Sequence, residues 1–237
     1  MTVSVVVPVK DEVDNVEALA REIQAAMAHE PSYEILFVDD GSTDGTTEKL
    51  TWLKNEIANF RPLRHGRNLG QSRGLATGIR AAKGEIIVTL DGDGQNDPAD
   101  IPRLLARLRG EQTLGMVSGV RVKRRDTASR RLASRLGNRF RNALLGDGAT
   151  DTGCGIKAFH RAAFLELPYF DHMHRYLIAL MQRHGWKVGF QPVNHRPRMA
   201  GRSKYTNLGR LLVSIHDMLG VRWLQRRYGG HVRIEEL

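Results

Sequence analysis

The sequence predicts an α/β fold with a mostly parallel central sheet flanked by helices. Short apolar stretches rich in β-branched residues, such as residues 4–9 and 33–38, alternate with segments whose apolar residues recur at helical spacing. A polar turn with acidic residues and glycine follows several of these stretches. This alternation is typical of parallel sheets, in which ligands bind beyond the carboxyl ends of the strands. We therefore expect a functional site at that edge of the sheet.

Strand and helix alternate through the first 120 residues. Strands are expected where apolar and β-branched residues run together, at residues 4–9, 33–38, 85–90 and 115–120. Helices are expected where apolar residues recur every three or four positions, around residues 16–27, 50–57, 75–82 and 98–109. The last helix has a start signal, because Asp97 can cap it and Pro98 suits the first helical position.

The second half of the chain is more basic. Nine Lys or Arg and one acid, Asp126, lie between residues 121 and 141. Apolar residues recur every four positions from Ala128 to Leu144, which predicts a basic amphipathic helix. A last amphipathic helix is expected at residues 207–226, with Ile215, Leu219 and Trp223 among its apolar positions. Between them we expect a loop at 146–155, a helix at 175–184 and a strand at 187–193.

Composition narrows the class of partner. The 237 residues carry 36 Lys or Arg against 26 acids, a formal charge of +10, which favours nucleic acid, anionic lipid or a phosphorylated substrate. Nucleic acid is the weaker option, because aromatic residues make up only 6% and no helix-turn-helix pattern accompanies the arginines. The single cysteine, Cys154, cannot form an intramolecular disulfide and fits a reducing cytoplasm. We expect neither a signal peptide nor a membrane-spanning helix, so any membrane association would be peripheral.

The turn after the third predicted strand carries the strongest indication of chemistry. Asp91, Asp93 and Gln95 stand there at alternate positions, and two glycines allow a tight turn. Three oxygen ligands suit a hard divalent ion, which keeps open positions for phosphate oxygens when protein ligands are few. A helix cap is the alternative reading, and it accounts for Asp97 and Pro98 but not for the other three residues.

Two further acidic pairs are expected at the same edge of the sheet. Asp11 and Glu12 follow the first strand, and Asp39 and Asp40 follow the second. So many carboxylates in one place are electrostatically costly unless cations or hydrogen-bond donors lie near them. A nucleotide with its metal would supply both, whereas each pair taken singly is more simply a solvated turn or a helix cap.

A second anion site is indicated late in the chain. Five basic or hydroxyl side chains stand within nine residues there, namely Arg196, Arg198, Arg202, Ser203 and Lys204. His172 and His174 have no partner at a zinc-binding interval, so we expect packing or surface roles for them. Cys154 is not tied to any particular histidine and is a poor candidate for a nucleophile.

Eight short motifs, taken in order, resemble those of family-two glycosyltransferases of GT-A fold. More narrowly, they are similar to those of polyprenol-phosphate sugar synthases of the dolichyl-phosphate mannose synthase type. They lie at residues 7–12, 38–44, 68–70, 78–84, 90–95, 118–121, 151–155 and 201–204. The resemblance implies a GT-A domain at residues 1–205, with a nucleotide-sugar half at 1–120 and an acceptor half at 121–205. A C-terminal amphipathic helix and tail would occupy residues 206–237.

The resemblance also implies roles for particular residues. The nucleoside of a sugar nucleotide would be held by Pro8, Glu12, Asp39 and Asp40, and its diphosphate, with Mg²⁺ or Mn²⁺, by Asp91, Asp93 and Gln95. The acceptor phosphate would be surrounded by Arg121, Arg131, Ser134, Arg198, Ser203 and Lys204. Asp93, Arg121 and Arg198 would act in catalysis. Three departures from the family pattern are Asp11, where Asn is usual, Gly92, where Ala is common, and the pair His174 and Arg175, where some relatives with hydroxyl acceptors carry acids.

These inferences lead to one hypothesis and three alternatives. The hypothesis is inverting transfer of a sugar from a nucleoside diphosphate sugar to a polyprenyl phosphate, an acceptor that is already anionic and needs no base. The basic helices at residues 128–144 and 207–226 would lie on anionic membrane at its cytoplasmic face, with or without an anchoring partner protein. The first alternative is a glycosyltransferase that acts on a carbohydrate hydroxyl, with Asp151 as base. The second is a sugar nucleotidyltransferase, which should have a glycine-rich loop after the first strand. The third is a nucleic-acid-binding protein.

Overall fold

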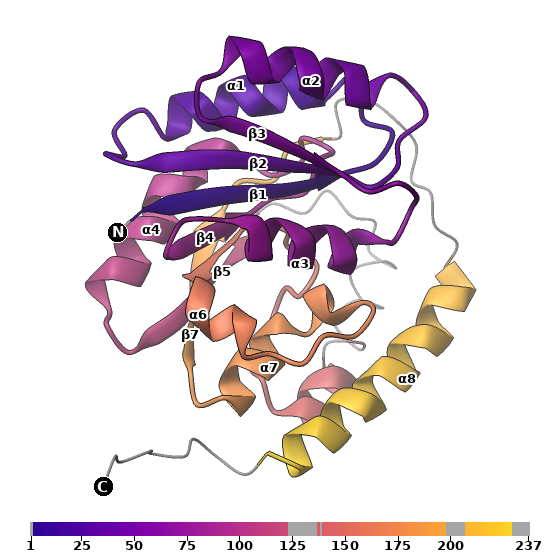
Figure 1. Cartoon of the computed structure of the whole chain (residues 1–237). Coiled ribbons are helices and arrows are strands. Elements are labelled where there is room, and N and C mark those ends of the chain that lie inside the picture. Colours follow the sequence, from indigo (N-terminus) through magenta and orange to yellow (C-terminus); the bar gives the residue numbers. More distant parts are fainter. Residues whose placement is uncertain (1, 123–136, 138, 198–206, 229–237) are drawn as a thin grey trace, which may run out of the picture.

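A seven-stranded sheet between two layers of helices forms the body of the protein (Figure 1). The computed structural model describes residues 2–122, 137, 139–197 and 207–228, and only the backbone of 207–213. In spatial order the strands are β3 (Phe60–Arg64), β2 (Tyr33–Asp39), β1 (Val3–Val9), β4 (Ile86–Thr89), β6 (Lys157–His160), β5 (Leu114–Arg121) and β7 (Lys187–Val193). The expected α/β fold with a mostly parallel sheet is confirmed.

The strand directions create one functional edge. β1 pairs in parallel with β2 and β4, β2 with β3, and β5 with β7. β6 runs antiparallel between β4 and β5. Six strands therefore end at the same edge of the sheet, which we call the carboxyl edge, whereas β6 begins there with Lys157.

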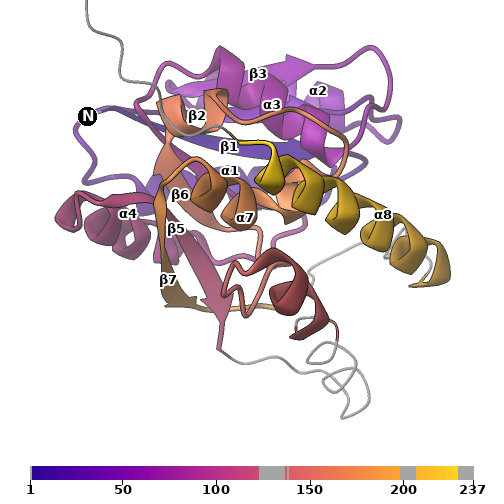
Figure 2. The ribbon, with the colours of Figure 1, turned by 90° about the horizontal axis from the view of Figure 1, so that it is seen from below.

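Helices cover both faces of the sheet because successive side chains of a strand point to opposite sides. Val3, Val5 and Val7 of β1 join the core formed with α1 (Val16–Ala26), α2 (Thr46–Glu56) and α4 (Ile101–Gly110). Val6 joins the opposite core, formed with α3 (Gln71–Ala81), α7 (Leu177–Arg183) and α8 (Asn207–Arg226). α8 lies beside α7 on the outside of this second layer (Figure 2).

Most of the expected elements are confirmed. β7 has the expected bounds, and the helix expected from residue 98 begins as a short 3₁₀ turn, η1 (Pro98–Asp100), before α4. The Asp97 side chain accepts a hydrogen bond from the Ala99 N–H at 3.1 Å, which confirms the predicted cap. A second 3₁₀ turn, η2 (Met173–Arg175), precedes α7. The sequence patterns do not predict β3, β6 or α6 (Arg161–Leu165).

The expected C-terminal helix is confirmed as α8, and its two faces differ in exposure. Met218 and Val221 are buried toward α7, whereas Ile215, Leu219 and Trp223 are exposed. The apolar positions singled out from the sequence therefore include an outward face of the helix. None of the helices among the described residues has the length and apolarity needed to cross a membrane.

The expected basic helix at residues 128–144 lies mostly outside the described residues. Its described end, residues 139–145, is helical. Arg141 is buried there, forms an ion pair with Asp147 at 2.5 Å, and lies with its guanidinium carbon 5.6 Å from the ring centre of Tyr176. Phe140 is exposed. The end of this segment is thus held to the protein through Arg141.

A buried carboxylate joins three strands at the amino edge of the sheet. Glu34 of β2 accepts hydrogen bonds from Ser4 Oγ of β1 and from the Lys83 N–H, each at 2.6 Å, and forms an ion pair with Arg61 of β3. Burial acts to raise the pKa of the Glu34 carboxyl, but the hydrogen bonds and Arg61 outweigh it and lower that pKa. Glu34 is therefore ionised in the folded chain and contributes to stability.

Replacing this carboxylate should weaken the fold in a pH-dependent way. Because the pKa of Glu34 is lower in the folded than in the unfolded chain, its contribution is present above the ordinary glutamate pKa and is lost as the pH falls through the folded-state value. At pH 7 Glu34→Gln should lower the free energy of unfolding by about 1–3 kcal/mol. Urea unfolding followed by circular dichroism measures the difference in the free energy of unfolding between the unchanged protein and the variant. This difference should shrink as the pH is lowered. Glu111→Gln, at a half-exposed surface ion pair, is the control; an equal loss in both variants would contradict the assignment.

Candidate active site

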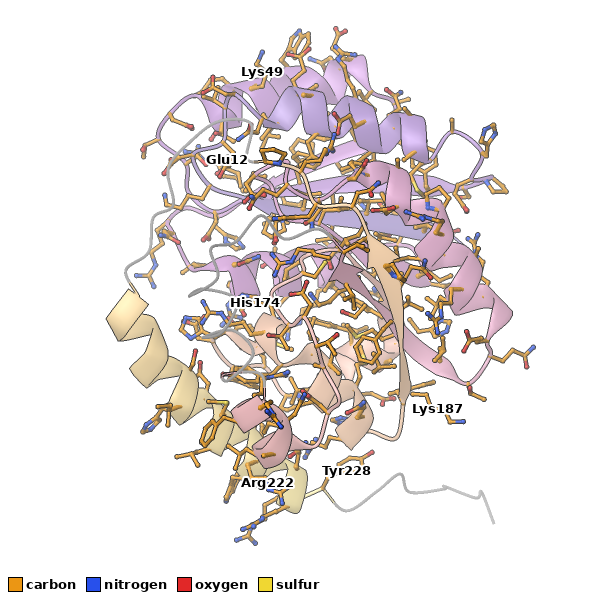
Figure 3. All side chains as sticks on the ribbon, turned by 180° about the vertical axis from the view of Figure 1, so that it is seen from behind. Glu12, Lys49, His174, Lys187, Arg222 and Tyr228 are labelled. Carbon is orange, nitrogen blue, oxygen red and sulfur yellow. The ribbon has the colours of Figure 1, made fainter. Side chains whose placement is uncertain are left out.

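A cavity of about 730 Å³ opens at the carboxyl edge of the sheet. Its wall brings together seven of the residues predicted from the sequence, namely Pro8, Glu12, Asp40, Asp91, Asp93, Gln95 and Arg121. Asp39 is not part of the wall. Five predicted acceptor residues, Arg131, Ser134, Arg198, Ser203 and Lys204, lie outside the described residues. Glu12 and His174, which both line the cavity, are labelled on the same side of the molecule in Figure 3.

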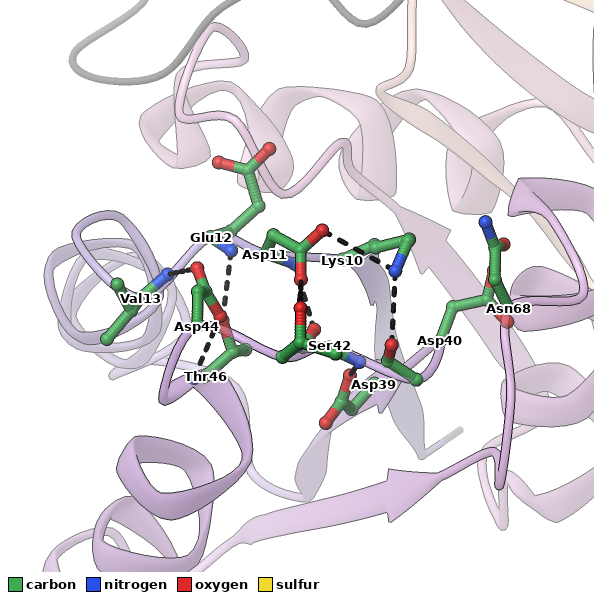
Figure 4. A network of polar contacts seen from close by, with 12 residues as sticks. Lys10, Asp11, Glu12, Val13, Asp39, Asp40, Ser42, Asp44, Thr46 and Asn68 are labelled. Carbon is green, nitrogen blue, oxygen red and sulfur yellow. Dashed lines mark hydrogen bonds and ion pairs between the residues drawn. The ribbon is translucent and has the colours of Figure 1, made fainter.

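The loops after β1 and β2 are joined by a polar network (Figure 4). The Asp11 N–H donates to Ser42 Oγ at 2.8 Å, and Asp11 Oδ1 accepts from the Thr43 N–H at 2.9 Å. Asp11 adopts a left-handed backbone conformation with a φ of 50°, which Asp and Asn tolerate better than most residues. The short polar side chain of Asp is therefore tolerated at this position. Lys10 Nζ completes the link by donating to Gly41 O at 3.1 Å.

The acidic pair at the end of β2 holds two loops, the one after β2 and the one between β3 and α3. Asp39 is buried and accepts from the Ser42 N–H at 2.8 Å. Asp40 is also buried and accepts from the Leu69 and Gly70 N–H groups at 2.8 and 2.7 Å. Backbone N–H donors therefore stabilise these buried carboxylates. The sequence pattern had suggested that a nucleotide and its metal would be needed for that. The predicted nucleoside contacts of these two residues stay a prediction.

The acidic turn after β4 faces the cavity. Gln71 Nε2 donates to Asp91 Oδ1 at 2.7 Å, and the Asp91 N–H donates to Asn96 Oδ1 at 3.0 Å, so Asp91 is held from two sides. Asp93 Oδ1 accepts from the Gln95 N–H at 3.1 Å, which closes the turn. The residues that could hold a metal ion thus come from one rigid turn.

The charges around this turn fit a cation. Burial and then the neighbouring Asp93 raise the pKa of the Asp91 carboxyl, while Lys157 and Arg121 act in the opposite direction. Two carboxylates and the amide oxygen of Gln95 are donors that Mg²⁺ and Mn²⁺ prefer. In the described part of the chain, no three Asp, Glu, His or Cys side chains come together as a metal site. With three oxygen donors from this turn, a cation would have positions left for other oxygen ligands.

A glycine lets a second loop approach the acidic turn closely. A Cβ on Gly155 would lie 2.2 Å from Asp91 Oδ2 and 2.7 Å from Asn96 Oδ1. The loop is fixed at this point, because Thr89 Oγ1 donates to Gly155 O at 2.8 Å. Any side chain at this position would displace Asp91.

Arg121 and Asp151 form a two-pronged ion pair beside the cavity. Arg121 Nε and Nη2 donate to the two Asp151 oxygens at 2.7 and 2.6 Å, and the Arg121 N–H adds a third bond at 3.1 Å. Asp151 is buried. Both of its oxygens are occupied by the guanidinium, so the geometry fits a structural ion pair and not a general base.

Several wall residues are missing from the sequence-based prediction. Lys157 is buried at the start of β6 and its ammonium donates to Cys154 O. His174 and Arg175 also line the cavity, where His174 was expected only to pack or to lie at the surface. Burial raises the pKa of the Cys154 thiol, which agrees with the expectation that it is not a nucleophile. No local pattern marks Lys157, which the fold brings to this edge, and the pair His174 and Arg175 was singled out only as a departure from the family pattern.

Arg196 contributes to the fold and not to the cavity. Its guanidinium donates to both Glu22 oxygens on α1, at 2.6 and 3.2 Å, and to Asn96 O at 3.1 Å. It is absent from the cavity wall formed by the described residues. The anion site expected around Gly201 therefore cannot rely on Arg196.

The sheet order and the acidic turn define a protein of GT-A fold, and solved structures agree. Mannosyl-3-phosphoglycerate synthase from Rubrobacter xylanophilus matches with a TM-score of 0.70 and 17% identity, over 100% of this chain and 78% of that one. Glucosyl-3-phosphoglycerate synthase from Mycobacterium tuberculosis, in complex with Mn²⁺, UDP and glucosyl-3-phosphoglycerate, matches with a TM-score of 0.67 and 18% identity, over 98% and 81%. At these identities the likeness establishes the fold.

Sequence comparison establishes the family. The model of glycosyl transferase family 2 matches residues 4–167. Dodecaprenyl-phosphate galacturonate synthase from Rhizobium johnstonii is 32% identical over 231 residues, which cover 95% of this chain and 68% of that protein. Undecaprenyl-phosphate 4-deoxy-4-formamido-L-arabinose transferase from Enterobacter sp. is 34% identical over 219 residues, covering 92% and 66%. The chain thus belongs to glycosyl transferase family 2, as its motifs predicted, and spans about two thirds of the length of these relatives.

Crowding Asp91 should damage the site without unfolding the protein. Gly155→Ala places a methyl group against Asp91 Oδ2, so the affinity for Mn²⁺ together with UDP should fall about 10- to 100-fold, the range seen when a metal ligand loses its support. Isothermal titration calorimetry measures the affinity. Gly110→Ala, where a Cβ would meet nothing within 4 Å, is the matched control. Unchanged affinity in Gly155→Ala would show that Asp91 does not hold the metal and nucleotide.

Proposed function

We propose that this chain transfers a glycosyl group, with inversion, from a nucleoside diphosphate sugar to a polyprenyl phosphate. The observation that carries the proposal is the turn with Asp91, Asp93 and Gln95 in the wall of the cavity at the carboxyl edge. Membership of glycosyl transferase family 2 supports the reaction class. The names of two relatives, which specify dodecaprenyl and undecaprenyl phosphate, support the acceptor class.

Asp91, Asp93 and Gln95 would hold Mg²⁺ or Mn²⁺. When bound, the metal would offset the charge of the departing diphosphate. Gln71 orients Asp91 for this role, and Asn96 holds the backbone of the turn. A glucosyl-3-phosphoglycerate synthase of the same fold binds Mn²⁺ together with UDP, which supports the pairing of metal and nucleotide.

The pairing of Asp151 with Arg121 supports an acceptor that needs no base. A sugar hydroxyl needs a base to remove its proton, and Asp151, the candidate considered for that task, has both oxygens bound to Arg121. A phosphate monoester is already anionic and needs no base. In the proposal, the acceptor phosphate is held by Arg121, Arg131, Ser134, Arg198, Ser203 and Lys204. Bound in this way, it would be aligned for in-line attack on the sugar.

The nucleoside would lie against the β1 side of the cavity. Pro8, Glu12 and Asp40 line this side. Asp39 would contribute through the loop after β2, because it holds the Ser42 N–H. Glu12 is itself oriented by Asn15 Nδ2, which donates to its carboxylate at 2.6 Å.

Removing one metal ligand should abolish lipid glycosylation. Asp93→Ala should reduce transfer roughly a hundredfold or more, because the diphosphate leaves without its cation. The assay incubates the protein with radiolabelled UDP- and GDP-sugars, Mn²⁺ and undecaprenyl phosphate, and counts label in the butanol phase. Asp14→Ala, an exposed acid away from the cavity, is the control. Label that enters only water-soluble product would reject the acceptor, and near-normal transfer by Asp93→Ala would reject the metal role.

We further propose that α8 rests on the cytoplasmic face of an anionic membrane. Ile215, Leu219 and Trp223 are spaced four residues apart and so share one helix face, with exposed fractions of 39%, 56% and 59%. Arg226 and Arg227 are exposed at the end of the same helix. An outward apolar stripe next to cationic residues suits the interface of an anionic bilayer.

Removing the apolar stripe should release the protein from membranes. The triple variant Ile215→Ser, Leu219→Ser, Trp223→Ser should bind phosphatidylglycerol vesicles at least about tenfold more weakly in a flotation assay, because three apolar side chains no longer enter the interface. Leu165→Ser, at an exposed leucine on α6, should float like the unchanged protein. Equal flotation of the triple variant would assign membrane binding to another surface. No flotation of the unchanged protein would reject the proposal that α8 rests on anionic membrane.

A further inference from the structure

His174 lines the cavity and is held by the first turn of α3. Its ring Nδ1 lies 2.7 Å from Ser72 Oγ, and its backbone N–H donates to the same oxygen at 3.3 Å. Ser72 is buried, with 1% of its surface exposed, and belongs to α3. The imidazole is therefore fixed in place by a residue that is 102 positions earlier in the chain.

These two contacts determine which ring nitrogen carries the proton. Ser72 Oγ already accepts a hydrogen bond from the backbone N–H of His174. Among the described residues, the acceptor for the Ser72 hydroxyl proton is the ring Nδ1 of His174. If Nδ1 instead carried a proton, the buried hydroxyl proton of Ser72 would be left without an acceptor, which is unfavourable. Nδ1 is thus the acceptor, and the proton of the neutral ring is on Nε2.

The ring presents a neutral donor to the cavity. Burial, and then the nearby Arg175, Lys157 and His172, lower the pKa of His174 to about 3, so the imidazole is uncharged at physiological pH. Nε2 makes no hydrogen bond to any described residue, and His174 is part of the cavity wall. A donor of this kind is available to a ligand.

The charges of the cavity indicate what such a donor would bind. Lys157, Arg121 and Arg175 line the wall and suit phosphate oxygens. A neutral N–H can donate to a phosphate, hydroxyl or carbonyl oxygen, but these three cations already serve the phosphates, so we assign the N–H to an uncharged oxygen of the sugar or the nucleoside. The nucleoside is assigned to the β1 side of the cavity, which includes Pro8 and Glu12. His174 belongs to η2, which packs against α3. The sugar is the remaining group.

We propose that His174 is a specificity-determining residue whose Nε2–H donates to an oxygen of the transferred sugar, with Ser72 as the positioning residue that fixes the ring. This inference rests on the proposed function. It predicts that His174 recognises the glycosyl group and makes no contact with the nucleoside diphosphate.

Calorimetry with and without the sugar tests this contact. The probes are UDP-glucose and GDP-mannose, each compared with its parent UDP or GDP in the presence of Mn²⁺. His174→Ala should weaken binding of the nucleotide sugar about 3- to 10-fold, the effect of one neutral hydrogen bond, and leave binding of the nucleoside diphosphate unchanged. His174→Gln should restore most of the loss, because its amide N–H can take the place of Nε2–H. His160→Ala, at a histidine outside the cavity wall, is the control.

Two further outcomes separate this inference from the proposed function. If His174→Ala weakens UDP and UDP-glucose equally, the sugar contact is wrong and the proposed function stands. If the unchanged protein binds neither nucleotide nor nucleotide sugar, the proposed function fails and the inference fails with it.

Nitrogen-15 NMR of the unchanged protein is independent of any variant. It should find the proton of the His174 ring on Nε2, and Ser72→Ala should yield a mixture of tautomers; a proton on Nδ1 would overturn the inference.

Discussion

Buried carboxylates at the carboxyl edge of the sheet shape the loops around them. An ionised carboxylate removed from water costs several kcal/mol unless donors surround it. Asp40 meets this requirement by drawing in the N–H groups of Leu69 and Gly70 and the ring of His65, which fixes residues 65–70 beside the cavity. Asp39 does the same for the loop after β2 through the Ser42 N–H. These hydrogen bonds hold the loops beside the cavity in a defined arrangement, which the positioning of two substrates demands.

The reversed strand β6 balances the charge of the site. Because β6 begins where its neighbours end, it carries Lys157 and the loop before it to the side of Asp91. Asp91 then lies between the like charge of Asp93 and the cations Lys157 and Arg121, with Gly155 leaving room for its carboxylate. A site with both signs of charge in contact can accept a metal and a diphosphate together, whereas an all-acidic cluster would repel the phosphates.

Sequence patterns predicted the parts of the structure that local periodicity controls. The strands of β1, β2, β4, β5 and β7, the helices between them and the cap at Asp97 follow from alternation and capping chemistry, and the acidic turn was found by its spacing. β6 was missed because its four residues begin with Lys157 and end with His160, whereas β4, of the same length, is a run of apolar and β-branched residues. Lys157 was missed, and His174 was singled out only as a departure from the family pattern, because tertiary contacts, and not their neighbours in the chain, bring both residues to the cavity. The hydrogen bonds that occupy Asp151 were likewise invisible to sequence patterns.

The central claim is that the turn after β4 holds a divalent cation and a nucleoside diphosphate. It is tested most directly by crystals of the protein grown with Mn²⁺ and UDP or GDP, measured at the manganese absorption edge. We expect one strong anomalous peak beside the Asp93 carboxylate, in contact with the diphosphate oxygens, with Asp91 and Gln95 within direct or water-mediated reach. A manganese peak elsewhere in the protein, or a nucleotide bound in the cavity without a cation at this turn, would contradict the claim.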